Sequence, residues 1–508
     1  MIETSSLLVL LPLWILLVAF IFCLLFWERI KVQAAIAVSA VSLYLLSAIG
    51  LFTAVYQSGI QVVQIGNWPA PFGITLVADL FASIMLLVSA LIAFAITLYA
   101  LQDISEARQR KGFFPIWLVM LFGVSGSFLT GDIFNLYVWF EVMLVASFVL
   151  LIIGNQKGQL EGAVKYVILS FISSGFLLTG IAIVYRLTGT LNMADLSVVV
   201  ARHPDPHLLT VASIFFIVGF GIKAALFPFF SWLPASYPTP PISVVALMAG
   251  LLTKVGIYAF IRFFTLIFTR DTGFTHTLLL LLSGLTMFVG VLGAVAQKDI
   301  KKILSFHIVS QIGYMVMGLA LFTPIAIAGA IFYIVHHILV KANLFLISGI
   351  VKETHGSFLL RKLGGVYDRF PFVTVLFVIA AFSLGGIPPL SGFWGKFMLA
   401  KAGLETGQYF IVVISLLVGL LTLFSMTKIW KSAFWSSLPE DTSREIHYTP
   451  KKLWQSNYLL LLSSTLLVLC TLSLSLFPEV LLSVATKAAE QLLNPEDYIQ
   501  AVLNRSVP

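Results

Sequence analysis

The sequence has little cysteine. Its 508 residues include two cysteines, Cys23 and Cys470, which lie far apart in separate apolar runs. Neither belongs to a CxxC motif, and no histidine cluster stands near either of them. A disulfide framework needs suitably placed cysteine pairs, and iron–sulfur and structural zinc sites need clustered ligands, so the sequence argues against all three. We therefore expect no metal site and no cofactor.

Charged residues and long polar segments are also scarce. Asp, Glu, Lys and Arg make up 10% of the chain, whereas apolar residues make up 59%. The longest polar connections, 352–371 and 431–453, have about 20 residues each, fewer than the roughly 50 that an independent domain needs. No soluble domain is expected between the apolar runs.

Long apolar runs take up most of the chain. A helix crosses a bilayer with about 20 apolar residues, and the apolar content suffices for about 14 such spans. Runs of this length are helices rather than barrel strands, because hydrocarbon offers backbone groups no other partner. The sequence predicts an all-α polytopic membrane protein with spans near 5–26, 32–56, 73–99, 113–131, 133–153, 162–186, 207–230, 241–266, 274–296, 302–322, 325–350, 372–398, 409–430 and 454–477.

Basic residues account for the net charge of +8, and they are grouped in alternate loops. The groups are Arg29 and Lys31; Arg108, Arg110 and Lys111; Lys157 and Lys165; Lys298, Lys301 and Lys302; Arg361, Lys362 and Arg369; and Arg444, Lys451 and Lys452. The positive-inside rule places these loops in the cytoplasm and both termini on the outer side of the cell membrane. The lipid bilayer explains the charge, so we expect no nucleic-acid partner.

Two spans contain helix breakers past their midpoints. Span 7 is interrupted near Pro228, and span 12 is interrupted near Pro388 and Pro389. Broken helices in corresponding positions of two halves are typical of transporters built from repeats. The breaks lie five spans apart, and an odd offset reverses the orientation in the membrane. We therefore predict two inverted five-helix repeats, covering spans 4–8 and 9–13.

These repeats divide the chain into four parts. We expect N-terminal helices in 1–112, the first repeat in 113–266 and the inverted second repeat in 274–430. Residues 431–508 are expected to hold a cytoplasmic loop, the last span and a tail. The tail places Leu481, Ala485, Ala488, Leu492 and Leu493 on one helical stripe, which predicts a short helix at the membrane surface.

Three charged residues of the first half lie inside predicted spans. Glu141 is about 13 Å of helix from the near end of span 5, too far for its short side chain to reach water. Lys254 is deeper still in span 8, and Lys223 adjoins the break of span 7. Charges at this depth cost roughly 2.5–3.5 kcal/mol each, so they indicate function, although a satisfied core carboxyl and a lysine that snorkels to the interface are the structural alternatives.

Span 11 carries titratable residues on one face. Tyr333, His337 and Lys341 are spaced at i, i+4 and i+8 and share a stripe, whereas His336 is turned about 100° away from it. Histidine and a desolvated lysine both exchange protons at accessible pH, so the stripe is typical of a proton relay. A lone buried histidine is more often a core residue, and we assign His336 and Tyr333 only accessory roles.

Lys396 follows the break of span 12, as Lys223 adjoins the break of span 7. Spacing alone also allows its side chain to snorkel to the outer interface. The prediction that Lys396 is part of the same proton pathway as the other buried charges therefore depends on the repeat.

Five motifs in order resemble a known family. They are FLTGDIFNLYVWFEVMLVASF, GIKAALFPFFSWLP, AGLLTKVGIYAFIRFF, VHHILVKANLF and GGIPPLSGFWGKF, and the resemblance covers about residues 73–430. The sequence is similar to the antiporter-like subunits shared by respiratory complex I, membrane-bound hydrogenases and Mrp-type multisubunit Na+/H+ antiporters. The phrases HHILVKANLF and GTLNMADLS are most similar to the Mrp branch.

The resemblance implies a secondary transporter subunit rather than an enzyme. In this family a mid-membrane axis conducts protons, and its positions correspond here to Glu141, Lys223, Lys254, His337, Lys341 and Lys396. The resemblance also implies partners, namely several other small membrane subunits, with H+ and Na+ as the transported ions.

Three other functions are compatible with the same residues. A proton-pumping subunit of a complex I or hydrogenase-like enzyme would use the same axis but would need redox partners. A non-conducting scaffold subunit would keep its function when the axis is neutralised. A stand-alone solute carrier would transport without partner subunits.

Overall fold

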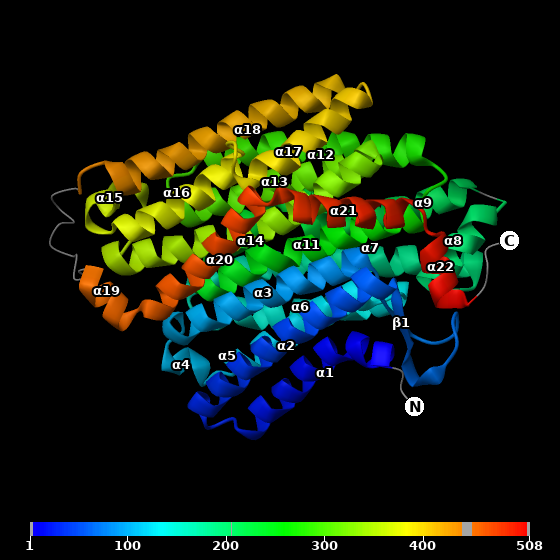
Figure 1. The fold of residues 1–508 in the computed structure, drawn as a ribbon, viewed down its shortest axis with the longest axis horizontal. Coiled ribbons are helices and arrows are strands. Elements are labelled where there is room, and N and C mark those ends of the chain that lie inside the picture. Colours follow the sequence, from blue (N-terminus) through cyan, green and yellow to red (C-terminus); the bar gives the residue numbers. More distant parts are fainter. Residues whose placement is uncertain (1–3, 205, 439–449, 505–508) are drawn as a thin grey trace.

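The structure is a computed structural model that describes residues 4–204, 206–438 and 450–504. Long helices lie side by side in one bundle (Figure 1). The first half contains α1 (Thr4–Leu25), α2 (Ile30–Ser58), β1 (Gln61–Gln64), η1 (Ile65–Asn67), β2 (Thr75–Ala78), α3 (Leu80–Asp103), α4 (Glu106–Gln109), α5 (Phe113–Leu129), α6 (Ile133–Ile152), α7 (Lys157–Thr188), α8 (Met193–Arg202), α9 (Pro206–Ala224), η2 (Phe229–Ser231), α10 (Trp232–Ser236) and α11 (Ile242–Leu266). The second half contains α12 (Thr272–Ala296), α13 (Ile300–Leu321), α14 (Pro324–His355), η3 (Leu360–Lys362), α15 (Val366–Arg369), α16 (Pro371–Gly385), α17 (Ser391–Glu405), α18 (Tyr409–Ile429), η4 (Trp430–Trp435), α19 (Pro450–Ser456), α20 (Tyr458–Leu476), α21 (Pro478–Leu493) and α22 (Glu496–Leu503).

The helices follow the predicted spans in order along the chain. Among the described residues, 12 helices are long and apolar enough to cross a membrane, and α5 and α16 are shorter apolar helices. The fold class predicted from the sequence is therefore confirmed. Residues 439–449, which include the predicted cytoplasmic Arg444, lie outside the described part of the chain.

The third span begins later than predicted. Residues 75–78 form β2, which pairs antiparallel with β1 in the register Gln61↔Ala78 and Gln64↔Thr75. Asp79 then caps α3 by accepting a hydrogen bond from the Ala82 amide at 2.8 Å. The prediction was wrong here because the strand residues TLVA are as apolar as the helix that follows, and it counts the single polar residue between them, Asp79, as part of the same apolar run.

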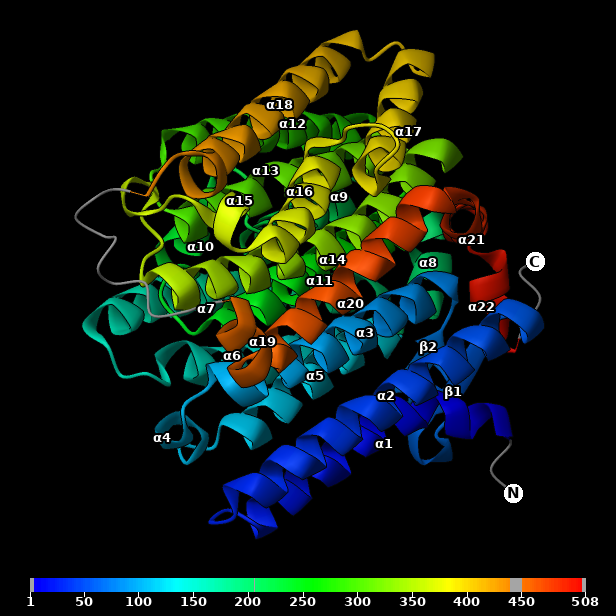
Figure 2. The ribbon, with the colours of Figure 1, turned by 60° about the vertical axis from the view of Figure 1, so that its left-hand side comes forward.

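The most buried helices lie at the centre of the bundle. All residues of α11 are buried, and so are 94% of the residues in the most apolar stretches of α13 and α14. Helices α1, α2 and α18 lie at the edges of the bundle, as the turned view shows (Figure 2). Their exposed residues, such as Leu46 and Leu420, are large and apolar, as expected for helices that face lipid.

A buried ion pair ties the β-hairpin end of α3 to the core. Arg262 Nη2 of α11 lies 2.6 Å from Asp79 Oδ2, and the side chains are 6% and 2% exposed. The Arg262 guanidinium also donates to the Tyr258 hydroxyl at 3.2 Å and lies 5.2 Å from the ring of Tyr498 in α22. These contacts join α3, α11 and the C-terminal helix at one end of the bundle.

Both predicted helix breaks are present. Helix α9 ends at Ala224 and the chain resumes as η2 and α10, while α16 ends at Gly385 and α17 begins at Ser391. At the first break the Phe227 amide donates to the Thr286 hydroxyl of α12 at 3.0 Å. Backbone groups released at a break need such partners inside a membrane.

The two halves also share a feature at the start of α6 and at the start of α13, which are corresponding helices of the two predicted repeats. Asp132 caps α6 and forms an isolated β-bridge with Asn192, while Asp299 caps α13 and forms one with Leu359. Each bridge joins a helix start to a segment the same distance further along the chain. This correspondence supports the inverted repeat, whereas the exact domain boundaries stay a prediction.

The tail forms a helix, but its apolar face packs on protein. Helix α21 ends before Asn494 and buries Ala485, Ala488 and Leu492. It packs against α14, α3 and α11, and its Gln491 side chain accepts a hydrogen bond from the Leu80 amide at 3.0 Å. The predicted stripe is therefore present, but it faces other helices because α14 and α3 offer an apolar surface to it.

Candidate functional site

Glu141 of α6 and Lys223 of α9 are linked through a serine of α7. The Ser174 hydroxyl donates a hydrogen bond to Glu141 Oε1, and Lys223 Nζ lies 3.5 Å from the same hydroxyl oxygen. Lys223 is buried and its Nζ also lies 5.8 Å from the centre of the Phe140 ring. The four ion pairs among the described residues do not include a direct one between Glu141 and Lys223.

Close packing places Lys223 in the last turn of α9. A Cβ on Gly256 of α11 would lie 2.9 Å from the Ala224 backbone nitrogen, so only glycine allows α11 to approach this closely. The indole of Trp232 donates to the Ile222 carbonyl at 3.0 Å and so also holds the end of the helix. The lysine therefore sits at a helix end that is fixed by two neighbours.

Lys254 lies at the centre of α11 with no exposed surface. Its Nζ donates to the Ala249 carbonyl of the same helix at 2.6 Å. The ammonium therefore stays at mid-membrane depth and does not reach either interface, which excludes snorkelling for this residue.

His337 and Lys341 of α14 are fully buried beside α11. The two ring nitrogens of His337 and Nζ of Lys341 have no hydrogen-bond partner within the described chain. Lys254 lies within electrostatic range of both side chains. Buried polar atoms without partners are rare in native proteins, so these nitrogens call for an explanation other than packing.

His336 and Tyr333 extend from α14 toward α17 and α13. His336 Nδ1 lies 2.8 Å from the Ser391 hydroxyl at the start of α17, which in turn lies 2.7 Å from the Ser383 hydroxyl of α16. The Tyr333 hydroxyl donates to Gln311 Oε1 of α13, and its ring centre lies 5.3 Å from that of His336. His336 thus connects α14 to the second break, although the stripe pattern had set it aside.

Lys396 binds the end of the broken helix. Its Nζ donates to the carbonyls of Leu384 and Gly385 at 3.0 and 3.1 Å and lies 5.1 Å from the ring centre of Tyr314. A cation at the last carbonyls of a helix is stabilised by the unpaired groups and the helix dipole. Lys396 therefore adjoins its break, as Lys223 adjoins the first one, and does not extend to the interface.

A further polar row on α13 was missed by sequence reasoning. His307, Gln311 and Tyr314 lie at i, i+4 and i+7, and all three are buried. They contact α18, since His307 Nε2 lies 2.8 Å from the Ser425 hydroxyl and Tyr314 donates to the Ser415 carbonyl at 2.5 Å. The same helical spacing that revealed the α14 stripe could have revealed this one.

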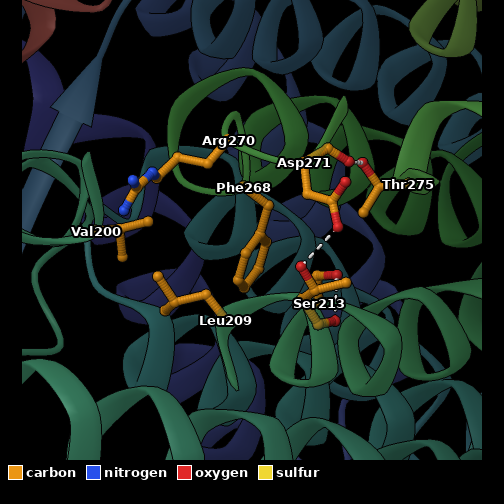
Figure 3. Close-up of a pocket in the computed structure, with 8 residues that line it drawn as sticks. Val200, Leu209, Ser213, Phe268, Arg270, Asp271 and Thr275 are labelled. Carbon is orange, nitrogen blue, oxygen red and sulfur yellow. Dashed lines mark hydrogen bonds between the residues drawn. The ribbon is translucent and has the colours of Figure 1, made fainter. Parts of the chain in front are cut away.

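A small cavity elsewhere holds none of the predicted residues. It has a volume of about 20 Å³ and lies near the beginnings of α9 and α12, where Asp271 accepts a hydrogen bond from Thr210 at 2.8 Å (Figure 3). A space of this size holds about one water molecule. Among the described residues, no group of three His, Cys, Asp or Glu side chains could hold a metal ion.

A helical membrane protein with two broken helices and a row of buried titratable side chains between them has the architecture of an ion-translocating membrane subunit. Comparison with protein families agrees with this class. The family model described as NADH:quinone oxidoreductase/Mrp antiporter, transmembrane region, matches residues 130–422. The chain belongs to this family.

Within the family, similarity extends over the whole chain to D subunits. The chain is 48% identical over 496 residues to the D subunit of the Na+/H+ antiporter of Alkalihalophilus pseudofirmus, covering 98% of this chain and 99% of the relative. It is 40% identical over 495 residues to the D subunit of the Na+/H+ antiporter of Bacillus subtilis, with 97% and 99% coverage. A chain in the structure of the Mrp complex from Dietzia sp. DQ12-45-1b superposes with a TM-score of 0.90 at 31% identity, covering 99% of this chain and 100% of that one.

Proposed function

We propose that this chain is the D subunit of a multisubunit Na+/H+ antiporter and moves protons along its buried titratable row. The observation that carries the proposal is that these titratable side chains lie on helices that pack against one another in turn, α9 on α11, α11 on α14 and α14 on α17. The row runs from Glu141 and Lys223 at the first break, through Lys254 and α14, to Lys396 at the second break. Full-length similarity to D subunits of Na+/H+ antiporters supports the same function.

The first step of the proposed mechanism uses the serine bridge. A hydroxyl both donates and accepts, so Ser174 can pass a proton between the Lys223 ammonium and the Glu141 carboxylate while its own oxygen stays in place. When a proton reaches Glu141, the carboxyl loses its charge and Lys223 loses an electrostatic partner. Lys223 then releases its proton toward Lys254, and the neutral amine takes up the proton of Glu141 through the Ser174 hydroxyl, which restores the charged pair.

The later steps use Lys254 and two side chains of α14. Lys254 donates to a carbonyl of its own helix, and the nitrogens of His337 and Lys341 have no hydrogen-bond partner within the described chain. Neutral imidazole accepts a proton at one nitrogen and releases one from the other. We infer that His337 and Lys341 receive the proton and that His336, with Ser391, delivers it toward Lys396.

The position of Glu141 supports the proposal that another subunit packs against α6. On α6 it shares a face with Phe134, Val138 and Val145, which are 44%, 40% and 62% exposed. A carboxylate is costly at a lipid-facing position, so we infer that another small membrane subunit of the complex covers this face. The carboxylate would then stand at the junction between two subunits.

The loops support the proposed orientation in a bacterial cell membrane. The basic residues Arg108, Arg110 and Lys111 lie between α3 and α5, at the opposite end of the bundle from the β-hairpin and α22 (Figure 1). The positive-inside rule places the basic end in the cytoplasm. The start of α1 and the end of α22 would then face outward.

Neutralising the row tests the proposal. The whole gene cluster is expressed in cells that lack other Na+/H+ antiporters, and Na+-dependent proton movement is measured in everted vesicles. We expect Glu141→Ala and Lys223→Ala to abolish exchange while the complex still assembles. The matched control is the exposed pair Glu161 and Lys165 of α7, joined at 2.7 Å, whose alanine variants should exchange normally.

The test also separates the other functions. A non-conducting scaffold predicts normal exchange in the Glu141 and Lys223 variants. A subunit of a redox-driven pump predicts proton movement that depends on an electron donor and not on Na+. A solute carrier predicts transport by the purified chain alone.

A further inference from the structure

An apolar cavity of about 530 Å³ lies between α2, α3, α14, α20 and α21. Its walls include Leu87 and Leu91 of α3, Val335 and Leu339 of α14, and Leu474 of α20. The volume falls in the range of about 300–1,000 Å³ that is usual for ligand sites. Its lining is almost wholly aliphatic and aromatic, so the ligand that fits it is a hydrocarbon chain.

The cavity extends to the depth of the middle of the membrane. Val335 and Leu339 lie about 16 and 22 Å from the first residue of α14, at 1.5 Å per residue. The hydrocarbon core of a bilayer is about 30 Å thick, so this wall of the cavity stands near the middle of the membrane. A chain that enters from one surface can therefore extend over half the membrane thickness.

The mouth of the cavity opens to the outside of the bundle. Phe477 and Val480, at the turn between α20 and α21, line it and are 66% and 69% exposed. The mouth therefore lies at the surface of the chain, where an acyl chain can enter from the side.

A polar pair lies one helical turn beyond this lining. Lys487 follows the lining residue Val484 on α21, and Tyr56 follows the lining residue Phe52 on α2. Lys487 Nζ donates to the Tyr56 hydroxyl at 3.0 Å and lies 4.5 Å from the centre of its ring. Lys487 forms no ion pair among the described residues, so its charge is available to an anion.

We propose that this cavity binds an anionic phospholipid, with one acyl chain between α3, α14 and α20 and the phosphate on Lys487 and Tyr56. The apolar depth matches the chain and the exposed ammonium matches the phosphate, which lysine binds as a point charge. The site is separate from the titratable row, and the proposal does not depend on the proton pathway. The bound chain would nevertheless touch α14 at Val335, the residue before His336.

Photolabelling of the assembled antiporter complex tests the site. The complex is reconstituted into liposomes that contain phosphatidylglycerol with a diazirine in one acyl chain, illuminated, digested and analysed by mass spectrometry. We expect adducts on the α14 and α20 peptides that line the cavity. Zwitterionic phosphatidylethanolamine with the same diazirine should label them about fivefold less, as expected when a lysine near the surface contributes about 1 kcal/mol to binding of an anionic lipid.

Paired variants locate the two parts of the lipid. Leu474→Trp fills the cavity and should remove the adducts, whereas Leu469→Trp, at a residue of the same helix that is 58% exposed and does not line the cavity, should leave them. Lys487→Gln should remove the preference for phosphatidylglycerol, and Lys401→Gln on α17 should keep it. If Leu474→Trp prevents assembly of the complex, Ser473→Phe narrows the same wall.

Three results would overturn the proposal. The first is equal labelling of the exposed residues Leu416 and Leu420 on α18, which would mean ordinary contact with bulk lipid. The second is labelling that Leu474→Trp and Ser473→Phe leave unchanged in assembled complexes. The third is a protein crosslink from the cavity to another subunit, which would mean that a partner helix occupies it.

Discussion

Replacing Ser174 by alanine tests whether the serine bridge carries protons. In Ser174→Ala the Glu141 carboxylate loses a hydrogen bond from α7, and Lys223 loses the oxygen that lies 3.5 Å from its Nζ. Both charged side chains remain, so the electrostatics of the pair are nearly unchanged. The variant therefore removes the hydroxyl that connects Glu141 to Lys223 and leaves both charged groups in place.

The structure sets the size of the expected effect. A hydrogen bond to a charged group contributes about 1.5–3 kcal/mol, and about 1.4 kcal/mol corresponds to a factor of ten in rate. If the bridge is used in the transfer step, Ser174→Ala should slow Na+-dependent proton exchange by about 10- to 100-fold. Ser174→Thr keeps the hydroxyl and should retain most of the rate.

Initial rates in everted vesicles, normalised to the amount of assembled complex, provide the measurement. The control is Ser173→Ala, because the Ser173 hydroxyl donates to the Gly219 carbonyl of α9 at 2.7 Å and bonds neither Glu141 nor Lys223. Wild-type exchange by Ser174→Ala would refute the reasoning. So would an equal loss in Ser173→Ala, since that result would point to the packing of α7 on α9.

Three further predictions concern other residues of the fold. Lys254→Arg should abolish exchange as fully as Lys254→Met, because arginine keeps the charge but does not release a proton in proteins; exchange by the arginine variant in vesicles would contradict a proton-carrying role. Arg262→Met and Asp79→Asn should each lower the free energy of unfolding in mixed micelles by about 3–5 kcal/mol, because each leaves a buried charge unpaired. The double variant should recover most of that loss, and additive losses would refute the assignment. Burial raises the pKa of Asp132 above its ordinary value of 3.8, so the folded chain holds that proton to higher pH than the unfolded chain and stability falls as pH rises through the titration. Asp132→Asn keeps the cap and should remove this part of the pH dependence of thermal unfolding, whereas an unchanged pH profile would show that Asp132 does not cause it.

The helices and their breaks could be predicted because hydropathy and proline position are properties of the sequence alone. The buried charges were found in the same way, since a lysine such as Lys254 stands out within an apolar run. The hairpin of β1 and β2 was missed, because pairing between Gln61 and Ala78 depends on residues far apart in the chain. The apolar strand then extended the predicted helix.

Side-chain partners were not predictable from spacing. Ser174 is one serine among many, and only the approach of α7 to α6 and α9 brings it between Glu141 and Lys223. The contact of Lys396 with the carbonyls of Leu384 and Gly385 depends on how the chain turns at the second break. These contacts depend on the tertiary packing of the helices, so they cannot be predicted from helix propensity or from the periodicity of the sequence.

The depth of the titratable row has a consequence for energy coupling. Glu141, Lys254 and His337 all lie near the middle of their helices, so a proton that passes between them moves parallel to the membrane plane. A transmembrane voltage of 100 mV does about 2.3 kcal/mol of work on one charge that crosses the whole membrane, and almost none on a charge that moves sideways. The voltage would then act on the entry and exit steps, and transfer along the row would respond mainly to changes in neighbouring charges.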